Sequence, residues 1–195
     1  AWDLTRGSDS QPETARKAVV KGYYCPSRRS PPKFSIQGAP GEGQQGSVGD
    51  YAFAVDDDPT DAMDSATASG SIVGSDKRVP CQPGSSDCNN PASNARRNWR
   101  GMTKFASVTD GLSNVLFAGE KHLVPGFEGQ RGFGDHNIYH GDVEWTVARI
   151  GATGYEIARG PTDTSNWHLR FGSNHPGVSQ FLLGDGSVRA FPTTT

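Results

Sequence analysis

The stretch that decides the fold lies near the end of the chain, where residues 171–191 read FGSNHPGVSQFLLGDGSVRAF. Pro176-Gly177 suits the two central positions of a type II turn, because glycine supplies the positive φ that the second position needs. Residues 179–183 then read as a strand, Gly184-Asp185-Gly186 as a tight turn, and residues 187–191 as the returning strand. The sequence therefore predicts a β-hairpin that closes the domain.

Two polar residues mark the ends of this hairpin. His175 lies at the start of the first strand and Asp185 lies in the far turn, so we do not expect the two side chains to touch. Each has two interpretations, a turn residue that bonds nearby backbone or a ligand or metal position. We favour the turn, because Asp-Gly is common hairpin chemistry.

Composition indicates a loop-rich domain with a modest core. The chain has 195 residues, of which 33% are hydrophobic, with 25 Gly and 13 Pro. We predict one globular domain over 1–195 with a long loop insertion at about 56–98, a length that is unusual inside a compact domain. The formal net charge of −2 argues against a nucleic-acid partner, which requires a basic surface.

The remaining elements are expected to be few. Ser10-Gln11-Pro12-Glu13 resembles a capping box, and a helix is predicted from there to Lys21, followed by a short strand or extended link over 23–25. Apolar, β-branched and aromatic residues predict strands over 50–55, 115–118 and 143–150. Together with the hairpin, these elements predict an α+β fold in which an antiparallel sheet with long loops packs on a helix.

The chain has three cysteines, and their spacing indicates which of them could form a disulfide or a zinc site. Cys81 and Cys88 bracket a turn-rich hexapeptide, so a disulfide between them is plausible in an exported protein. Cys25 is then left over, and its simplest interpretation is a small buried hydrophobe. The CxxC spacing typical of zinc sites built from cysteine is absent.

Three separated blocks carry a family resemblance. They are Tyr24-Cys25-Pro26-Ser27, residues 103–121 with Thr109-Asp110-Gly111 and Gly119-Glu120, and His175 followed nine residues later by Asp185-Gly186. The chain resembles the prepilin-type H-X9-DG family, a group of exported proteins abundant in planctomycete bacteria. Leu112 and Val178 depart from the family pattern. The residues that match the family motifs are Cys25, Asp110, Gly111, Asn114, Glu120, His175, Asp185 and Gly186.

The resemblance implies a structural role. Family members carry a pilin-like globular domain behind an apolar N-terminal helix, so this chain is expected to be the C-terminal part of a longer protein. The expected function is a non-enzymatic, pseudopilin-like subunit of an extracytoplasmic assembly, membrane-anchored or filamentous, without a cofactor. Its partners would be copies of itself or other pilin-like subunits, and membrane contact would come only through the missing helix. Without that helix, one sheet face is expected to expose apolar surface.

The alternative is an extracellular binding module for a glycan or Ca²⁺. It would use the loops at 56–98 and 126–142. Carboxylates in the first loop could supply oxygen ligands for Ca²⁺, although their spacing is not that of an EF-hand and we favour a solvated acidic surface. The candidate ligands are Asp56, Asp57, Asp58 and Asp61. Aromatic residues could form a glycan platform, although we favour core and loop packing. These are Trp99, Phe133, Tyr139, Trp145 and Trp167.

No pattern of a catalytic site is found. The Gly-x-Ser-x-Gly elbow is absent. His136, His140 and Glu144 are four apart, but turn formers surround them and an HExxH motif is missing. Glu120 is interpreted as a solvated strand end, and the alternative is an ion pair with Lys121, Arg131 or Arg170. We therefore expect no catalytic residues and no enzymatic activity.

Overall fold

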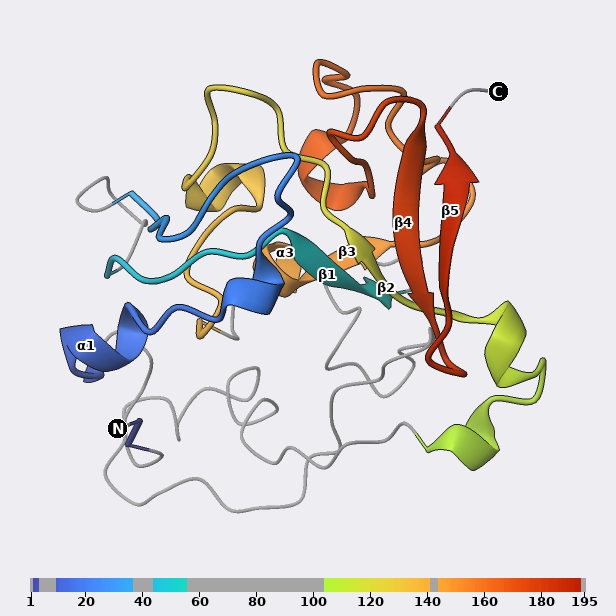
Figure 1. The fold of residues 1–195 in the computed structure, drawn as a ribbon, viewed down its shortest axis with the longest axis horizontal. Helices are drawn as coiled ribbons and strands as arrows, with labels where there is room; N and C mark the ends of the chain where they lie inside the picture. The colour runs from blue at the N-terminus through green and yellow to red at the C-terminus, as the bar shows by residue number, and fades with distance from the viewer. Residues whose placement is uncertain (1, 4–9, 37–43, 56–103, 141–143, 194–195) are drawn as a thin grey trace, which may run out of the picture.

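The protein is an α+β domain built on a five-stranded sheet (Figure 1). The computed structural model describes residues 2–3, 10–36, 44–55, 104–140 and 144–193. The strands are β1 (Tyr51–Val55), β2 (Leu116–Glu120), β3 (Ala148–Ile150), β4 (Val178–Leu183) and β5 (Val188–Pro192), and the sheet order is β3-β1-β2-β4-β5. The α+β prediction is confirmed.

The sheet is mixed rather than fully antiparallel. β1 pairs with β2, β2 with β4 and β4 with β5 in antiparallel fashion, but β3 runs parallel to β1 through three residue pairs from Phe53–Ala148 to Val55–Ile150. β3 lies at the edge of the sheet beside β1 and therefore runs antiparallel to β2, the strand that precedes it along the chain.

The predicted helix near the start of the described chain is shorter than expected. α1 spans only Glu13–Arg16, has no side-chain cap, and buries only Arg16. The predicted helix to Lys21 and its capping box are wrong, because Val19 and Val20 remain more than a third exposed and a helix without an apolar face to bury is marginal. The link predicted over 23–25 is in part the 3-10 turn η2 (Lys21–Tyr23).

The strand predicted over 143–150 is half wrong. α3 (Glu144–Val147) is a helical turn, and only β3 joins the sheet. Short apolar runs are compatible with either periodicity, so the sequence could not separate the two. The remaining short elements are 3-10 turns: η4 (Phe105–Ser107), η5 (Leu112–Asn114), η6 (Arg131–Phe133) and η7 (Trp167–Leu169). In the described part of the chain, no helix has the length and apolar character needed to cross a membrane.

The closing hairpin is confirmed. β4 and β5 pair over five residues from Val178–Pro192 to Leu182–Val188. Gly177 and Gly186 adopt φ of 71° and 84°, the left-handed region that their turns require. Asp185 bonds its own turn, because its carboxylate accepts from the Ser187 N–H at 2.9 Å and from the Ser187 hydroxyl at 2.7 Å.

The core under the sheet is small and rich in aromatic rings. Ala52, Ala54, Phe171 and Phe181 form its buried centre. The rings of Phe171 and Phe181 meet edge to face with centroids 5.0 Å apart, a favourable geometry for aromatic pairs. Gly119 of β2 lies against both rings, so a Cβ added there would fall 2.5 Å from a Phe181 ring carbon and 2.9 Å from Phe171.

We predict that Gly119→Ala destabilises the fold by about 1–3 kcal/mol, the usual cost of overpacking a core. Urea unfolding followed by tryptophan fluorescence measures the change. Gly132→Ala is the matched control, because a Cβ there meets nothing within 4 Å. Equal stability of the Gly119→Ala variant and the wild type would contradict this packing.

Candidate functional site

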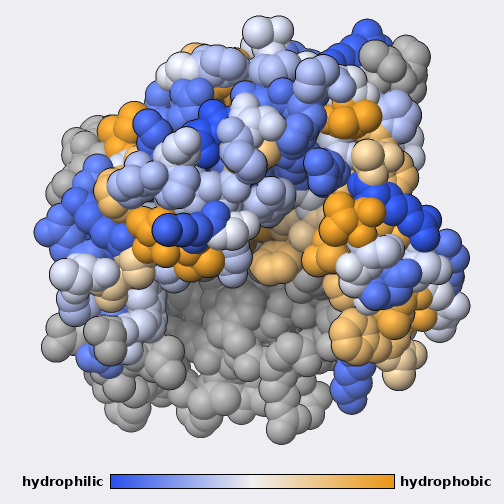
Figure 2. Space-filling model, in the orientation of Figure 1, coloured by the Kyte–Doolittle hydropathy of each residue, from blue (hydrophilic) through white to orange (hydrophobic). Residues whose placement is uncertain are grey.

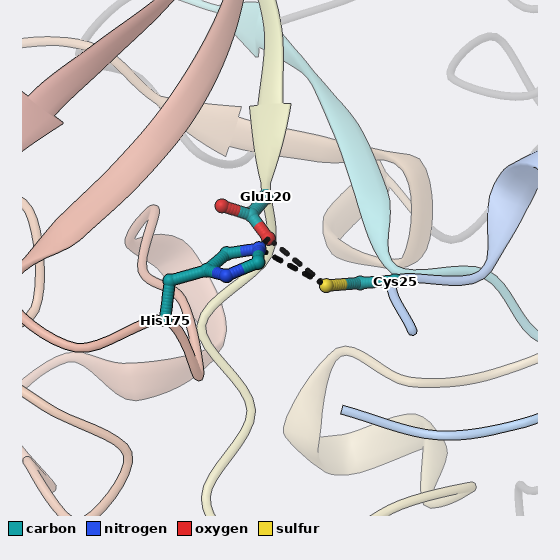
Figure 3. Close-up of side chains that lie close together, drawn as sticks. All are labelled: Cys25, Glu120 and His175. Carbon is teal, nitrogen blue, oxygen red and sulfur yellow. Dashed lines mark hydrogen bonds and ion pairs between the residues drawn. The ribbon is translucent and has the colours of Figure 1, made fainter. Parts of the chain in front are cut away.

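Three residues that are distant in sequence converge at the end of β2 (Figure 3). Cys25 Sγ lies 3.2 Å from Glu120 Oε1 and 3.5 Å from His175 Nε2. His175 Nε2 lies 3.3 Å from the same Glu120 oxygen. Cys25 and Glu120 are 1% exposed, and the His175 side chain is 24% exposed. The three ligand-type atoms therefore form a compact triangle that is open to solvent on the His175 side.

Neighbouring groups hold each member of the triangle in place. The Cys25 N–H donates to Asp50 Oδ2 at 2.7 Å. The second oxygen of Glu120 accepts the Gln180 N–H at 2.8 Å. His175 Nδ1 lies 3.1 Å from the Ser27 hydroxyl. Each residue thus directs one side-chain atom toward the other two members, while another atom of the residue (the backbone N–H for Cys25) is anchored outside the triangle.

Burial shapes the ionisation of the thiol. The pKa of Cys25 is raised, first by desolvation and then by the hydrogen bond to Glu120 and the charge of that carboxylate, against a smaller lowering effect of the Ser27 backbone and Arg28. The thiol therefore stays protonated at neutral pH and donates to Glu120, unless a cation enters the triangle.

The strand arrangement explains the spacing between His175 and the Asp185-Gly186 pair. Nine residues between His175 and Asp185 span β4 and its turns, so His175 lies at the Glu120 end of β2 and Asp185 at the other end. At that far end the Asp185 N–H donates to the Leu112 carbonyl at 3.2 Å. The Asn114 amide donates to the Asp110 carbonyl at 2.9 Å, and Gly111 adopts φ of 87°.

The motif residues therefore form two groups at opposite ends of β2. Asp110, Gly111, Asn114, Asp185 and Gly186 make turns joined by backbone hydrogen bonds. Cys25, Glu120 and His175 make the triangle. The expectation that His175 and Asp185 do not touch is confirmed, and the interpretation of Glu120 as a solvated strand end is wrong, because Cys25 and His175 cover it.

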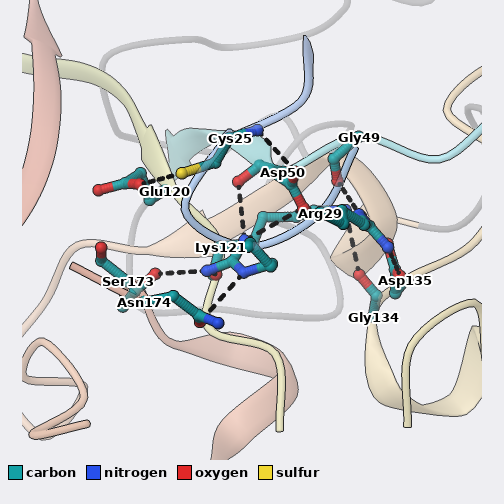
Figure 4. A network of polar contacts seen from close by, with 12 residues as sticks. Cys25, Arg29, Gly49, Asp50, Glu120, Lys121, Gly134, Asp135, Ser173 and Asn174 are labelled. Carbon is teal, nitrogen blue, oxygen red and sulfur yellow. Dashed lines mark hydrogen bonds and ion pairs between the residues drawn. The ribbon is translucent and has the colours of Figure 1, made fainter. Parts of the chain in front are cut away.

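A buried ionic network lies next to the triangle (Figure 4). Arg29 bridges two fully buried carboxylates, since its Nη2 lies 2.8 Å from Asp50 Oδ1 and 2.9 Å from Asp135 Oδ1. Lys121 is also fully buried and approaches Asp135 at 3.4 Å. Asp135 further accepts the Gly129 N–H at 2.8 Å. The network ties the segment after Cys25 to the start of β1, the end of β2 and the 129–135 loop.

Arg28 joins the network to the loop that carries His175. Its guanidinium donates to the carbonyls of Lys121 at 2.5 Å and Gly172 at 3.1 Å, and it contacts Asp50 Oδ1 at 3.3 Å. One side chain therefore holds three segments at the distances that the triangle needs.

Burial and neighbouring charges shift the pKa values of Asp135 and Lys121 in the network. Burial alone would raise the pKa of Asp135, but the neighbouring Lys121 and Arg29 hold it well below its usual range. Burial lowers the pKa of Lys121 to about 7, against the opposing charge of Asp135. Asp135 is therefore the carboxylate on which the charge balance of this interior depends.

The outer face of the sheet carries an apolar row. Phe53 pairs with Ala118, Ala118 with Leu182 and Leu182 with Val188, so the four side chains cross β1, β2, β4 and β5 in register. Phe53, Leu182 and Val188 are 44%, 40% and 62% exposed. A groove of about 520 Å³ runs along this row, and Figure 2 shows apolar side chains gathered around a hollow near the middle of the view.

The other predicted site residues do not join the triangle or lie outside the described residues. Outside are the Ca²⁺ candidates Asp56, Asp57, Asp58 and Asp61, the cysteines Cys81 and Cys88, the loop at 56–98, and Trp99. His136 and His140 are buried, with rings 5.5 Å apart. The described aromatic candidates contact different rings: Phe133 packs on Trp167, Trp145 on His168 and Tyr139 on Trp2.

Comparison with known proteins gives a family but no relative of established function. The family described as "Protein of unknown function (DUF1559)" matches residues 2–195. The chain therefore belongs to the DUF1559 family. No curated protein matches significantly, and no solved structure does. The narrower assignment to the prepilin-type H-X9-DG group stays a prediction.

The sequence did not predict that Cys25, Glu120 and His175 would lie together. Local spacing could not reveal it, because its members lie 95 and 55 residues apart along the chain. A usable signal was present nonetheless, since each of the three family-like blocks contributes one member.

We predict that Asp135→Asn lowers the free energy of unfolding at neutral pH by about 3–5 kcal/mol, the cost of removing one partner from a buried ionic group. Because the pKa of Asp135 is depressed in the fold, its contribution is present above about pH 4 and is lost as pH falls. The variant should therefore show a weaker loss of stability on acidification.

Urea unfolding at neutral pH and at about pH 3 tests both parts, since the lower value lies below the ordinary pKa of aspartate. Glu128→Gln, at an exposed carboxylate, is the control and should behave as the wild type. An Asp135→Asn variant as stable as the wild type at neutral pH would contradict the role given to the network.

Proposed function

We propose that this chain is a non-enzymatic, pseudopilin-like structural subunit of an extracytoplasmic assembly, either membrane-anchored or filamentous. In this proposal an apolar helix packs on the outer face of the sheet. The supporting observation is the apolar row of Phe53, Ala118, Leu182 and Val188, which crosses four strands in register. Monomeric soluble domains rarely leave such a continuous apolar surface uncovered.

The dimensions of the row suit one helix. Four neighbouring strands span about 14 Å at the usual spacing of strands in a sheet. An α-helix with its side chains is about 10–12 Å wide. The groove along the row is flanked by Tyr23 and Tyr51, which are 50% and 40% exposed and can pack on the sides of a helix.

The resemblance to the prepilin-type family supplies the occupant. It implies an apolar helix that precedes the globular domain and packs on its sheet. The partners would then be further copies of this chain or other pilin-like subunits, which contact one another through their helices.

The proposal is tested in the cells that make the protein, with a photocrosslinking amino acid in place of Leu182. We expect crosslinks to an apolar helical segment of the same protein or of a pilin-like subunit. The same group in place of Val20, which is 39% exposed and outside the row, is the control and should not capture that segment. Crosslinks confined to residues 1–195, or to a protein without such a helix, would contradict the proposal.

A second test uses charge. Leu182→Asp places a carboxylate in the middle of the row and should remove the protein from the assembled fraction, because burying an unpaired charge is costly. Val20→Asp is the matched control and should assemble normally. Fractionation followed by immunoblotting measures assembly, and circular dichroism of the purified variants confirms that both fold. Unchanged assembly of a folded Leu182→Asp protein would contradict helix docking on this face.

A further inference from the structure

The geometry of Cys25, Glu120 and His175 points to a metal site, and we propose that these three side chains bind Zn²⁺. Their ligand atoms are separated by 3.2, 3.3 and 3.5 Å. Tetrahedral zinc with ordinary Zn–S, Zn–N and Zn–O bond lengths places its ligand atoms about 3.4–3.6 Å apart. The triangle therefore has nearly the size of one face of a zinc tetrahedron. The site goes beyond the structural role proposed above and does not depend on it.

The arrangement differs from a cysteine nucleophile with a histidine base. In such a site the acid holds one ring nitrogen of the histidine while the other faces the nucleophile. Here Cys25 Sγ and Glu120 Oε1 both lie at the Nε2 atom of His175. Three ligand-type atoms directed at one point suit a shared cation.

The anchors around the triangle match those of a metal site. A histidine ligand usually has its other ring nitrogen held by a hydrogen bond, and ligating carboxylates are held in the same way. Ser27 meets the Nδ1 atom of His175, and the Gln180 N–H occupies Oε2 of Glu120. Nε2 and Oε1 are thereby left directed at the centre of the triangle.

Charge also favours a divalent cation. Glu120 is 1% exposed, and among the residues that the structure describes no lysine or arginine forms an ion pair with it. Buried charges are normally paired or bound to a metal. When Zn²⁺ binds, the Cys25 thiol loses its proton to solvent and becomes a thiolate. The thiolate and the Glu120 carboxylate then carry two negative charges, which the charge of Zn²⁺ balances. A thiolate ligand selects zinc over Ca²⁺ and Mg²⁺, which prefer oxygen.

The site offers three protein ligands and one open position. The exposed edge of His175 and the exposed Pro176-Gly177 turn leave room for water as the fourth ligand, as is common in zinc sites with three protein ligands. Bound zinc would connect the loop after Tyr24, the end of β2 and the loop before β4. Because the ion binds the folded state, it should raise thermal stability by mass action.

The test is a titration of the metal-free protein with Zn²⁺, followed by competition with a chromophoric chelator. We expect one ion per chain and a rise in Tm. His175→Gln and Cys25→Ser should each weaken binding by more than about 100-fold, since even loss of a group that only orients a ligand costs up to that factor. Ser27→Ala should weaken it by about 10-fold.

The other two cysteines provide the matched control. The Cys81→Ser/Cys88→Ser double variant keeps Cys25 as its one thiol and should bind Zn²⁺ as the wild type does. With Co²⁺ as the probe, this variant should show a thiolate-to-cobalt charge-transfer band that Cys25→Ser lacks. The proposal is overturned if the wild type binds no Zn²⁺ stoichiometrically. It is equally overturned if folded His175→Gln and Cys25→Ser proteins, checked by circular dichroism, bind the ion as tightly as the wild type.

Discussion

The buried ionic network around Arg29 is the interaction on which the described structure depends. Its guanidinium bridges the carboxylates of Asp50 and Asp135, and Lys121 adds a fourth buried ionisable group. A chain with 33% hydrophobic residues builds only a small core, so polar groups must hold its long connections together. Such a network stabilises the fold only while every charge has its partner, because a single unpaired charge in the interior lowers the free energy of unfolding. The loops that meet at Asp135 are therefore fixed as a unit.

The network also places the residues of the Cys25–Glu120–His175 triangle. The Asp50 carboxylate accepts the Cys25 backbone N–H. Arg28 joins Asp50 to the backbone carbonyls of Lys121 and Gly172. Lys121 follows Glu120 directly, and successive residues of an extended chain point to opposite faces. Because the Lys121 side chain is buried in the network, the Glu120 side chain points the other way, into the triangle. The site and the network therefore lie on opposite sides of the end of β2.

The sequence predicted the parts of the fold that rest on local chemistry. The hairpin at 178–192 followed from its turn residues, and β1 and β2 followed from their apolar patterns. Interactions distant in sequence decided the rest. Residues 17–21 do not continue the predicted helix, and Val19 and Val20 remain more than a third exposed there. Residues 144–147 are helical although their composition suits a strand. Glu120 could not be recognised as buried, because Cys25 and His175, which cover it, lie far away along the chain.

The central claim is that the three family-like blocks meet in one metal site at the end of β2. A crystal structure of the protein grown with Zn²⁺, with data collected at the zinc absorption edge, tests it most directly. The account predicts one anomalous peak at about 2.0–2.3 Å from Cys25 Sγ, Glu120 Oε1 and His175 Nε2. Zinc bound only at other residues, with these three side chains turned away from one another, would contradict it.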